Sequence, residues 1–287
     1  MSDFYPFPTH PYRRTPPLKR RGEKMKVLVF GLPRTGTTSL CAALNELGYN
    51  SYSMTECCLN HRSDSLRHWL AAIDAKYNNK GLPYRGAQFD AMLSRYDAVT
   101  GFPGILFVEE LMDAYPDAVI ILTTRWTDGW LRSVQRTLRL ASGLKRLWLL
   151  SWFDITYIDR ATTLLRTSLK IITGKHREGG NPNDPERLLS AYHSHNAHVQ
   201  GAALARNRPV LEYRVEDGWG PLCWFLNKPR PDSLFPRLSQ GDSVRQYLYL
   251  VFWCRVVELG APLVVGMVGL YALALAWGVH VQLVMGW

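Results

Sequence analysis

The sequence predicts an α/β fold in which a doubly wound parallel sheet is covered by helices on both faces. Short apolar segments typical of buried strands alternate with segments of helical periodicity from residue 25 to residue 242. The segment 118–123, AVIILT, is apolar throughout, as expected of a strand in the middle of a parallel sheet. Ligands of such sheets bind beyond the carboxyl ends of the strands, which directs attention to the residues that follow each strand.

The elements follow one another in a regular order along this part of the chain. We expect strands or strand-turn segments at 26–30, 49–54, 96–104, 118–123 and 209–215. We expect helices at 37–47, 63–77, 107–114, 128–140, 145–173, 186–204 and 221–227. Gly48 ends the first helix in the usual way. Within 145–173, the Trp- and Leu-rich side chains suit either the wall of a ligand-binding pocket or an ordinary helical core.

Composition divides the 287 residues into four parts. Residues 1–24 carry six basic and five proline residues, and we expect a disordered basic arm. Residues 25–242 form the α/β domain, and 243–258 form an apolar juxtamembrane segment. The five cysteines match neither a zinc site nor a disulfide framework, so we expect no metal. The net charge of +10 suits an anionic ligand, but aromatic and basic residues do not alternate, so we expect no nucleic acid.

The C-terminal part, 259–287, lacks Asp, Glu, Lys and Arg altogether. Its segment 261–281 is long and apolar enough for a transmembrane helix, since about 20 apolar residues span a bilayer. Arg245 and Arg255 precede this segment and no charge follows it, which predicts a single-pass anchor with the domain facing the cytosol. A very apolar buried helix is the alternative interpretation.

The turn after the first strand has the composition of a phosphate-binding loop. In GLPRTGTTS, Gly31 and Gly36 bracket the turn, and hydroxyl-bearing residues open the helix. A helix start binds anions because its first N–H groups are unpaired and carry partial positive charge. The spacing is that of a Walker A loop, but Thr37 replaces the lysine and Arg34 is the cation of the loop. A tightly packed turn without a ligand is the alternative, and the NAD-binding pattern G-x-G-x-x-G is not met.

A second group of polar residues follows the apolar strand 118–123. Arg125 comes directly after the strand end, and Ser133 lies eight positions later on the next expected helix. A guanidinium fork and a hydroxyl can hold one phosphate group together. A capped surface turn involving Asp128 is the alternative. An NTPase or kinase is disfavoured by Thr37 and because Thr-Thr-Arg stands at the end of the strand 118–123, without the carboxylate of a Walker B motif.

Together, these two elements resemble the PAPS-dependent sulfotransferases, most closely the fungal sulfotransferase-like proteins. The resemblance covers residues 25–240 and rests on four segments: VFGLPRTGTTSLCAALNELGY, YDAVTGFPGILFVEELMDAYPDAVIILTTR, DGWLRSV and VEDGWGPLCWFLNKPRPDSLFPR. It implies a sulfotransferase-like fold, PAPS as cofactor, and sulfuryl transfer to a hydroxyl of a small, apolar acceptor. It also implies that the 5′-phosphosulfate is held by Arg34, Thr35, Gly36, Thr37, Thr38 and Ser39. Arg125 and Ser133 are implied ligands of the 3′-phosphate.

Catalysis requires a base to accept the acceptor's proton and a cation to stabilise the leaving oxygen. Arg34 and the helix start are the expected stabilising groups. Glu56 is the first candidate base, because some glycosaminoglycan sulfotransferases look similar in placing a glutamate there; a solvated loop carboxylate is the alternative. The further candidates are Asp97, Glu109, Glu110 and His193.

Two positions depart from the family pattern. Gly101 stands where the family usually shows an aspartate, and Trp126 follows Arg125 where aspartate is common. The loss of a carboxylate at position 101 leaves a second hypothesis open. In that hypothesis the chain is a catalytically degenerate sulfotransferase-fold protein that binds a nucleotide or a partner at a membrane.

Overall fold

The computed structural model describes residues 25–59, 64–142, 158–172 and 184–238, together with residues 260, 266 and 267. The chain divides into two compact units, Met1–Leu238 and Ser239–Trp287. The expected arm 1–24 and the segment 243–258 lie outside the described residues. Among the residues that are described, no helix has the length and apolar character to cross a membrane. Apart from residues 266 and 267, the expected transmembrane segment 261–281 is not among them.

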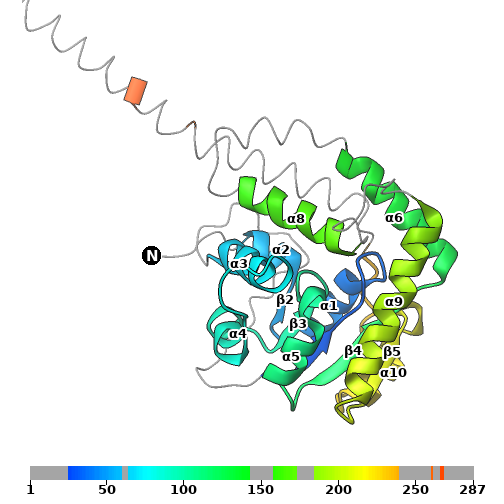
Figure 1. The fold of residues 1–287 in the computed structure, drawn as a ribbon. Coiled ribbons are helices and arrows are strands. Elements are labelled where there is room, and N and C mark those ends of the chain that lie inside the picture. The colour runs from blue at the N-terminus through cyan, green and yellow to red at the C-terminus, as the bar shows by residue number, and fades with distance from the viewer. Residues whose placement is uncertain are drawn as a thin grey trace, which may run out of the picture. The chain divides into compact units, whose positions relative to one another are not determined.

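Five parallel strands form one sheet in the order β2-β3-β1-β4-β5 (Figure 1). The strands are β1 (Val27–Val29), β2 (Ser51–Tyr52), β3 (Ala98–Thr100), β4 (Val119–Thr123) and β5 (Val210–Tyr213). Val29 is in register with Thr100 of β3 and Ile121 of β4, so the carboxyl ends of these strands lie at one edge of the sheet. The predicted α/β class and parallel sheet are confirmed.

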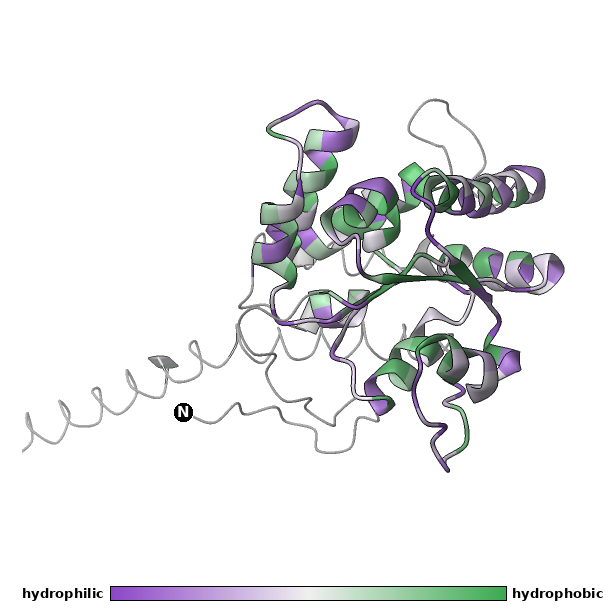
Figure 2. Cartoon of the chain, turned by 90° about the horizontal axis from the view of Figure 1, so that it is seen from below, coloured by the Kyte–Doolittle hydropathy of each residue, from purple (hydrophilic) through white to green (hydrophobic). Residues whose placement is uncertain are grey.

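Helices flank the sheet on both sides, and the apolar strands lie between them (Figure 2). The helices are α1 (Thr37–Glu46), α2 (Met54–Leu59), α3 (Ser65–Tyr77), α4 (Gly86–Leu93), α5 (Val108–Ala114), α6 (Thr127–Ser142), α8 (Ile158–Ile172), α9 (Pro185–Leu204) and α10 (Trp219–Phe225), with short 3-10 turns η2 (Gly104–Phe107) and η3 (Val215–Asp217). All three residues of β1 are buried, which explains why this strand is apolar on both of its faces.

One core of the domain joins α1 and α10 to the sheet. Leu40 and Leu44 of α1 pack with Val27 and Val29 of β1 and with Trp219 of α10. Residues three and four apart share a helix face, so the spacing of Leu40 and Leu44 brings both to the sheet. Burial of such side chains contributes about 2 kcal/mol each.

Two helices were not expected from the sequence. One of them is α2, which begins at Met54 and limits the second strand to Ser51–Tyr52. Helix α4 was not expected, since only Phe89 and Leu93 of its eight residues are buried and this gives little periodicity. Helix α9 begins as the sequence suggests, with the Asp184 side chain accepting a hydrogen bond from the Glu186 N–H (3.2 Å) and Pro185 in the first turn.

The strand order reverses beside the predicted phosphate loop. The chain leaves β1 toward β2 on one side, whereas it leaves β4 toward β5 on the other. The connections that begin at β1 and β4 therefore run to opposite ends of the sheet, and ligands of open α/β sheets bind where the strand order reverses in this way. The loop 31–36 and Arg125 both lie at this position.

Candidate active site

The loop between β1 and α1 is held by close contact with β4. A Cβ atom added to Gly31 would lie 1.6 Å from the Oγ1 of Thr123, so no other residue fits there without displacement of β4. The Thr35 hydroxyl lies 2.7 Å from the Leu32 carbonyl, to which it donates, and 2.6 Å from the Thr123 hydroxyl. Thr35 is buried, and its side chain therefore stabilises the loop from within.

The loop leads directly into the first turn of α1. Gly36 is the N-cap and provides no side-chain hydrogen bond to the first turn. Thr37 and Thr38 are half-buried at this helix start, where unpaired N–H groups favour an anion. The Ser39 hydroxyl is buried and accepts a hydrogen bond from the N–H of Leu238, 2.9 Å away. Ser39 therefore ties the end of the domain to the loop helix.

The two predicted ligand groups meet in the structure. The Arg34 Nε donates a hydrogen bond to the Ser133 Oγ at 2.8 Å, although the residues lie 99 positions apart. The Arg125 Nη1 donates to the Arg34 carbonyl at 3.3 Å. The loop after β1, the loop after β4 and helix α6 thus converge on one point at the carboxyl edge of the sheet.

Positive charge accumulates at this point. The pKa of the Arg34 guanidinium is lowered, first by burial and then by the charges of Arg125 and Arg136. Arg136 lies three positions after Ser133 on α6, and such spacing places both on one helix face. Arg136 was not singled out from the sequence, although this spacing could have indicated it. Guanidiniums that repel one another are stabilised by a bound anion, so the cluster fits a phosphate group.

Two aromatic residues hold the backbones of the two loops in place, Tyr192 at Arg125 and Trp130 at Pro33. The Tyr192 hydroxyl accepts a hydrogen bond from the Arg125 N–H (3.0 Å) and donates one to the Arg125 carbonyl (2.9 Å). Its ring packs 4.5 Å from that of Trp130, whose Nε1 donates to the Pro33 carbonyl at 3.0 Å. Helices α6 and α9 therefore orient both loops. Neither residue was singled out from the sequence.

Trp126, the unusual residue after Arg125, does not enter this arrangement. Its side chain is 71% exposed. The guanidinium of Arg214 lies 4.9 Å from its ring centroid, within the range of a cation–π contact.

Two of the expected bases lie elsewhere. Asp97 precedes β3, at the amino edge of the sheet, where it accepts the Asn50 N–H at 2.5 Å and lies 3.6 Å from the Lys26 ammonium. The loop lies at the opposite edge, so the structure does not bring Asp97 to the site. His193 is exposed on α9 and its ring contacts that of Tyr192, so it does not fit the role either.

Glu56 occupies an intermediate position. It lies on α2, and its Oε1 accepts a hydrogen bond from the Tyr96 hydroxyl at 2.9 Å. Burial raises the pKa of the neighbouring Cys41 thiol, and the charge of Glu56 adds to this shift. Cys41 lies one turn after Thr37, so Glu56 stands beside α1 rather than over the loop. Its role as a base stays a prediction.

Gly101 lies against the first turn of α1. It follows β3 directly and has φ of 60°, a backbone conformation that favours glycine. A Cβ added there would lie 3.2 Å from the Thr37 Cγ2. The position that carries aspartate in the family pattern is therefore beside the loop helix, and this chain has no carboxylate there.

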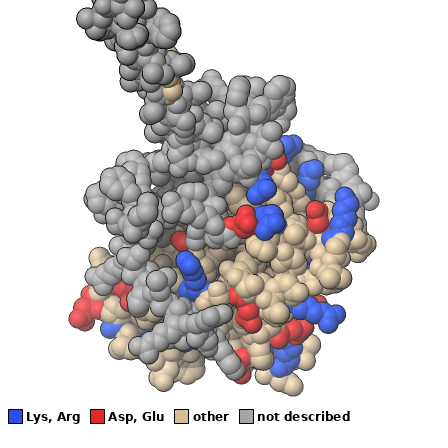
Figure 3. Space-filling view, turned by 90° about the vertical axis from the view of Figure 1, so that its left-hand side faces the viewer, with Lys and Arg blue, Asp and Glu red and all other residues tan. Residues whose placement is uncertain are grey.

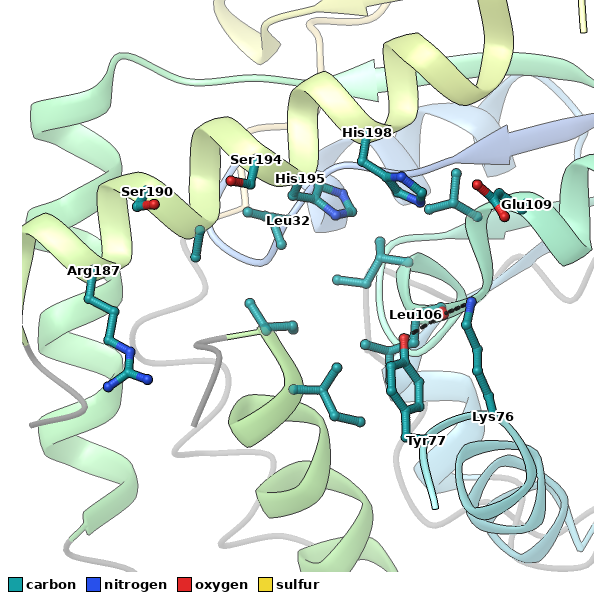
Figure 4. A pocket seen from close by; sticks show the side chains of 15 residues that line it. Leu32, Lys76, Tyr77, Leu106, Glu109, Arg187, Ser190, Ser194, His195 and His198 are labelled. Carbon is teal, nitrogen blue, oxygen red and sulfur yellow. Dashed lines mark hydrogen bonds between the residues drawn. The ribbon is translucent and has the colours of Figure 1, made fainter. Parts of the chain in front are cut away.

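A cavity of about 640 Å³ opens beside the loop (Figure 4). Leu32 of the loop, the segment from η2 to α5, the end of α3, the last turn of α8 and one face of α9 surround it. Of the segment 145–173, Ile171 and Ile172 line the cavity, while 145–157 lies outside the described residues. Glu109 lines the cavity, whereas Glu110 pairs with Lys76 at 2.7 Å. The volume suits a small organic molecule.

Other charged groups do not form an obvious binding surface on the face drawn in Figure 3, where basic and acidic side chains of the described residues are intermixed. Within the described ranges, no three His, Cys, Asp or Glu residues are grouped so that they could hold a metal ion.

The parallel sheet, the glycine-bracketed loop and the arginine cluster define an α/β protein with a cationic site that suits a phosphate-bearing ligand. The sulfotransferase domain family matches residues 26–244. The chain is also 36% identical over 249 residues to Ava biosynthesis cluster protein M of Aspergillus versicolor, across 86% of this chain and 94% of that relative. The chain therefore belongs to the sulfotransferase family and is a transferase.

Proposed function

We propose that this enzyme transfers the sulfuryl group of PAPS to a hydroxyl of a small, apolar acceptor. The contact of the Arg34 side chain with Ser133, with Arg125 bonded to the Arg34 carbonyl, carries this proposal. It joins the loop that suits a phosphosulfate to the residues that suit a second phosphate. A ligand that carries phosphate-type groups at both the 5′ and the 3′ position of its ribose fits such a joined site better than ATP, whose phosphates are all at the 5′ position.

Each residue of the site has a role in this proposal. The first turn of α1, with Thr37 and Thr38, holds the 5′-phosphosulfate through N–H groups and hydroxyls. Arg34 stabilises the negative charge that develops on the leaving oxygen. Arg125 and Ser133 hold the 3′-phosphate by a fork and a hydroxyl. PAPS is the donor substrate and supplies the activated sulfuryl group.

The acceptor and the location are also part of the proposal. The Aspergillus relative is named for a biosynthesis cluster, which supports an acceptor that is a small biosynthetic product. The apolar run 261–281, with basic residues only before it, supports a single-pass membrane anchor that leaves the domain in the cytosol.

The degenerate alternative rests on Gly101. If catalysis in this chain depended on a carboxylate at that position, the protein would bind PAPS or its bisphosphate product without turning it over. Position 101 contacts Thr37 of the loop helix, so this alternative concerns the same site.

Labelled sulfuryl transfer tests the proposal. Full-length protein in detergent is incubated with ³⁵S-labelled PAPS and 2-naphthol, an apolar body with one hydroxyl. The proposal predicts labelled aryl sulfate with release of adenosine 3′,5′-bisphosphate, and loss of both with Arg125→Ala. Binding of PAPS without any transfer would favour the alternative function.

A further inference from the structure

The cavity beside the phosphate loop is lined by both aliphatic and polar side chains. The aliphatic ones come from the loop, η2, α5 and α8, among them Leu32, Ile105 and Ile171. Helix α9 presents Ser190, Ser194, His195 and His198 to the cavity, and Tyr77 and Lys76 of α3 lie away from this helix, as Figure 4 shows. A molecule with an apolar body and a hydroxyl group matches this lining, with its hydroxyl directed toward α9.

His195 connects this cavity to the phosphate loop. Its Nε2 lies 2.6 Å from the carbonyl oxygen of Phe30, the residue directly before Gly31. A carbonyl oxygen only accepts hydrogen bonds, so Nε2 carries the hydrogen in this contact. In a neutral ring the other nitrogen, Nδ1, then has a free lone pair for accepting a proton.

The surroundings keep this ring neutral. Burial lowers the pKa of His195 below its usual 6.5, and the neighbouring His198 lowers it further, while the Phe30 carbonyl acts against this. The other titratable or charged groups around the cavity are Lys76 and Tyr77 from α3, Glu109 from α5 and Arg187 from α9. His195 is therefore unprotonated at neutral pH, as a general base must be.

We propose that this cavity binds the acceptor, an apolar alcohol or phenol, and that His195 is the general base of the transfer. This inference rests on the proposed function. The acceptor oxygen forms a bond to sulfur as the bond between sulfur and the 5′-phosphate oxygen breaks. That electron pair stays on adenosine 3′,5′-bisphosphate, and the acceptor proton moves to the His195 Nδ1 and later to water.

The other candidate bases are placed less well for this role. Glu56 is bonded to Tyr96 and does not line the cavity. Glu109 lines the cavity but is largely exposed, so water reduces its effect on an acceptor. With His195 as the base, this chain can catalyse the transfer although glycine replaces the aspartate of the family pattern at position 101.

Replacing His195 by glutamine removes the proposed base but can keep the hydrogen bond to the Phe30 carbonyl. In His195→Gln, the side-chain amide can still donate to the Phe30 carbonyl, but it has no basic nitrogen. His68→Gln is the matched control, since His68 lies on α3, bonds Tyr84 at 3.2 Å and is not part of the cavity wall. We expect kcat with 2-naphthol to fall by about 100-fold or more in His195→Gln. The control keeps kcat within about twofold.

Binding measurements show whether a lower kcat arises from the base alone. Adenosine 3′,5′-bisphosphate should bind His195→Gln with unchanged affinity, and its melting temperature should match that of the wild type. Wild-type activity should rise with pH to a plateau, with a midpoint below 6.5, and this dependence should be absent from the residual activity of His195→Gln. A wild-type kcat in His195→Gln would overturn the inference while leaving sulfuryl transfer intact.

A spectroscopic measurement tests the same residue without turnover. ¹⁵N NMR of the histidines should show His195 protonated at Nε2 and unprotonated at Nδ1 at pH 7. Addition of 2-naphthol to the bisphosphate-bound protein should shift the Nδ1 signal. A hydrogen on Nδ1, or no shift at saturating 2-naphthol, would contradict the assignment. Failure of the wild type to bind the bisphosphate would instead contradict the proposed function itself.

Discussion

The Nε of Arg34 donates a hydrogen bond to the hydroxyl of Ser133, and the two atoms lie 2.8 Å apart. This contact joins the loop after β1 to helix α6 and brings the ligand groups of two distant segments together. In the proposed function, Arg34 takes the place of the lysine that a loop with Walker spacing usually carries. The arginine within the loop supplies the positive charge, and α6 fixes its direction.

Ser133→Ala tests the contribution of this contact to ligand binding. The substitution removes a hydroxyl partner of Arg34 and a proposed phosphate ligand. A hydrogen bond to a charged group is worth about 1.5 kcal/mol or more, so we expect about tenfold weaker binding of adenosine 3′,5′-bisphosphate. Calorimetric titration measures it. Ser94→Ala, at an exposed position after α4, is the control and should bind like the wild type.

Arg136→Gln tests whether the third guanidinium recognises the 3′-phosphate. Arg136 contributes to the lowered pKa of Arg34, so its charge lies close to the cluster. We expect about tenfold weaker binding of adenosine 3′,5′-bisphosphate and little change for adenosine 5′-phosphate. Arg132→Gln, one turn earlier and also exposed, removes the same charge as a control. Equal losses in both variants would show a general charge effect instead.

Gly31→Ala tests the packing of the loop against β4. The added methyl would overlap the Thr123 hydroxyl, so β4 or the loop must move. We expect a loss of about 3 kcal/mol in the free energy of unfolding. Chemical denaturation measures this loss. Gly201→Ala is the matched control, because nothing lies within 4 Å of its added Cβ. Gly201 lies in the last turn of α9, where alanine should stabilise the protein by about 0.5–1 kcal/mol.

Gly101→Asp distinguishes an enzyme from a degenerate relative. We expect the wild type to transfer sulfate and the aspartate to bring no gain, because His195 supplies the base. Strain at a φ of 60° and contact with Thr37 should cost about 1 kcal/mol of stability. Gly101→Asn shares the strain without the charge and is the control. An inactive wild type together with an active Gly101→Asp would support the degenerate alternative.

The phosphate loop and its proximity to Arg125 could be predicted because short sequence patterns determine where the strands and the loop begin and end. The expected strand 26–30 and helix 37–47 differ from Val27–Val29 and Thr37–Glu46 by only a few residues. A glycine-bracketed turn fixes such boundaries within a short segment. The approach of Arg125 to the loop followed from parallel strands that end at one edge.

The surroundings of the histidines could not be predicted, because they depend on which face of α9 meets the sheet. Residues two apart point to nearly opposite sides of a helix, so His193 and His195 differ in their surroundings. The buried Tyr192 and Val199 lie three before and four after His195 on one face. This spacing indicates that His195 faces the sheet. Asp97 could not be placed for a related reason, since a residue next to a strand can lie at either edge of the sheet.

The most direct test of the central claim compares two nucleotides by calorimetric titration of the full-length protein. The account predicts that adenosine 3′,5′-bisphosphate binds at least tenfold more tightly than ATP. It further predicts that Arg125→Ala abolishes this preference. Tighter binding of ATP, or a bisphosphate affinity unchanged by Arg125→Ala, would contradict it.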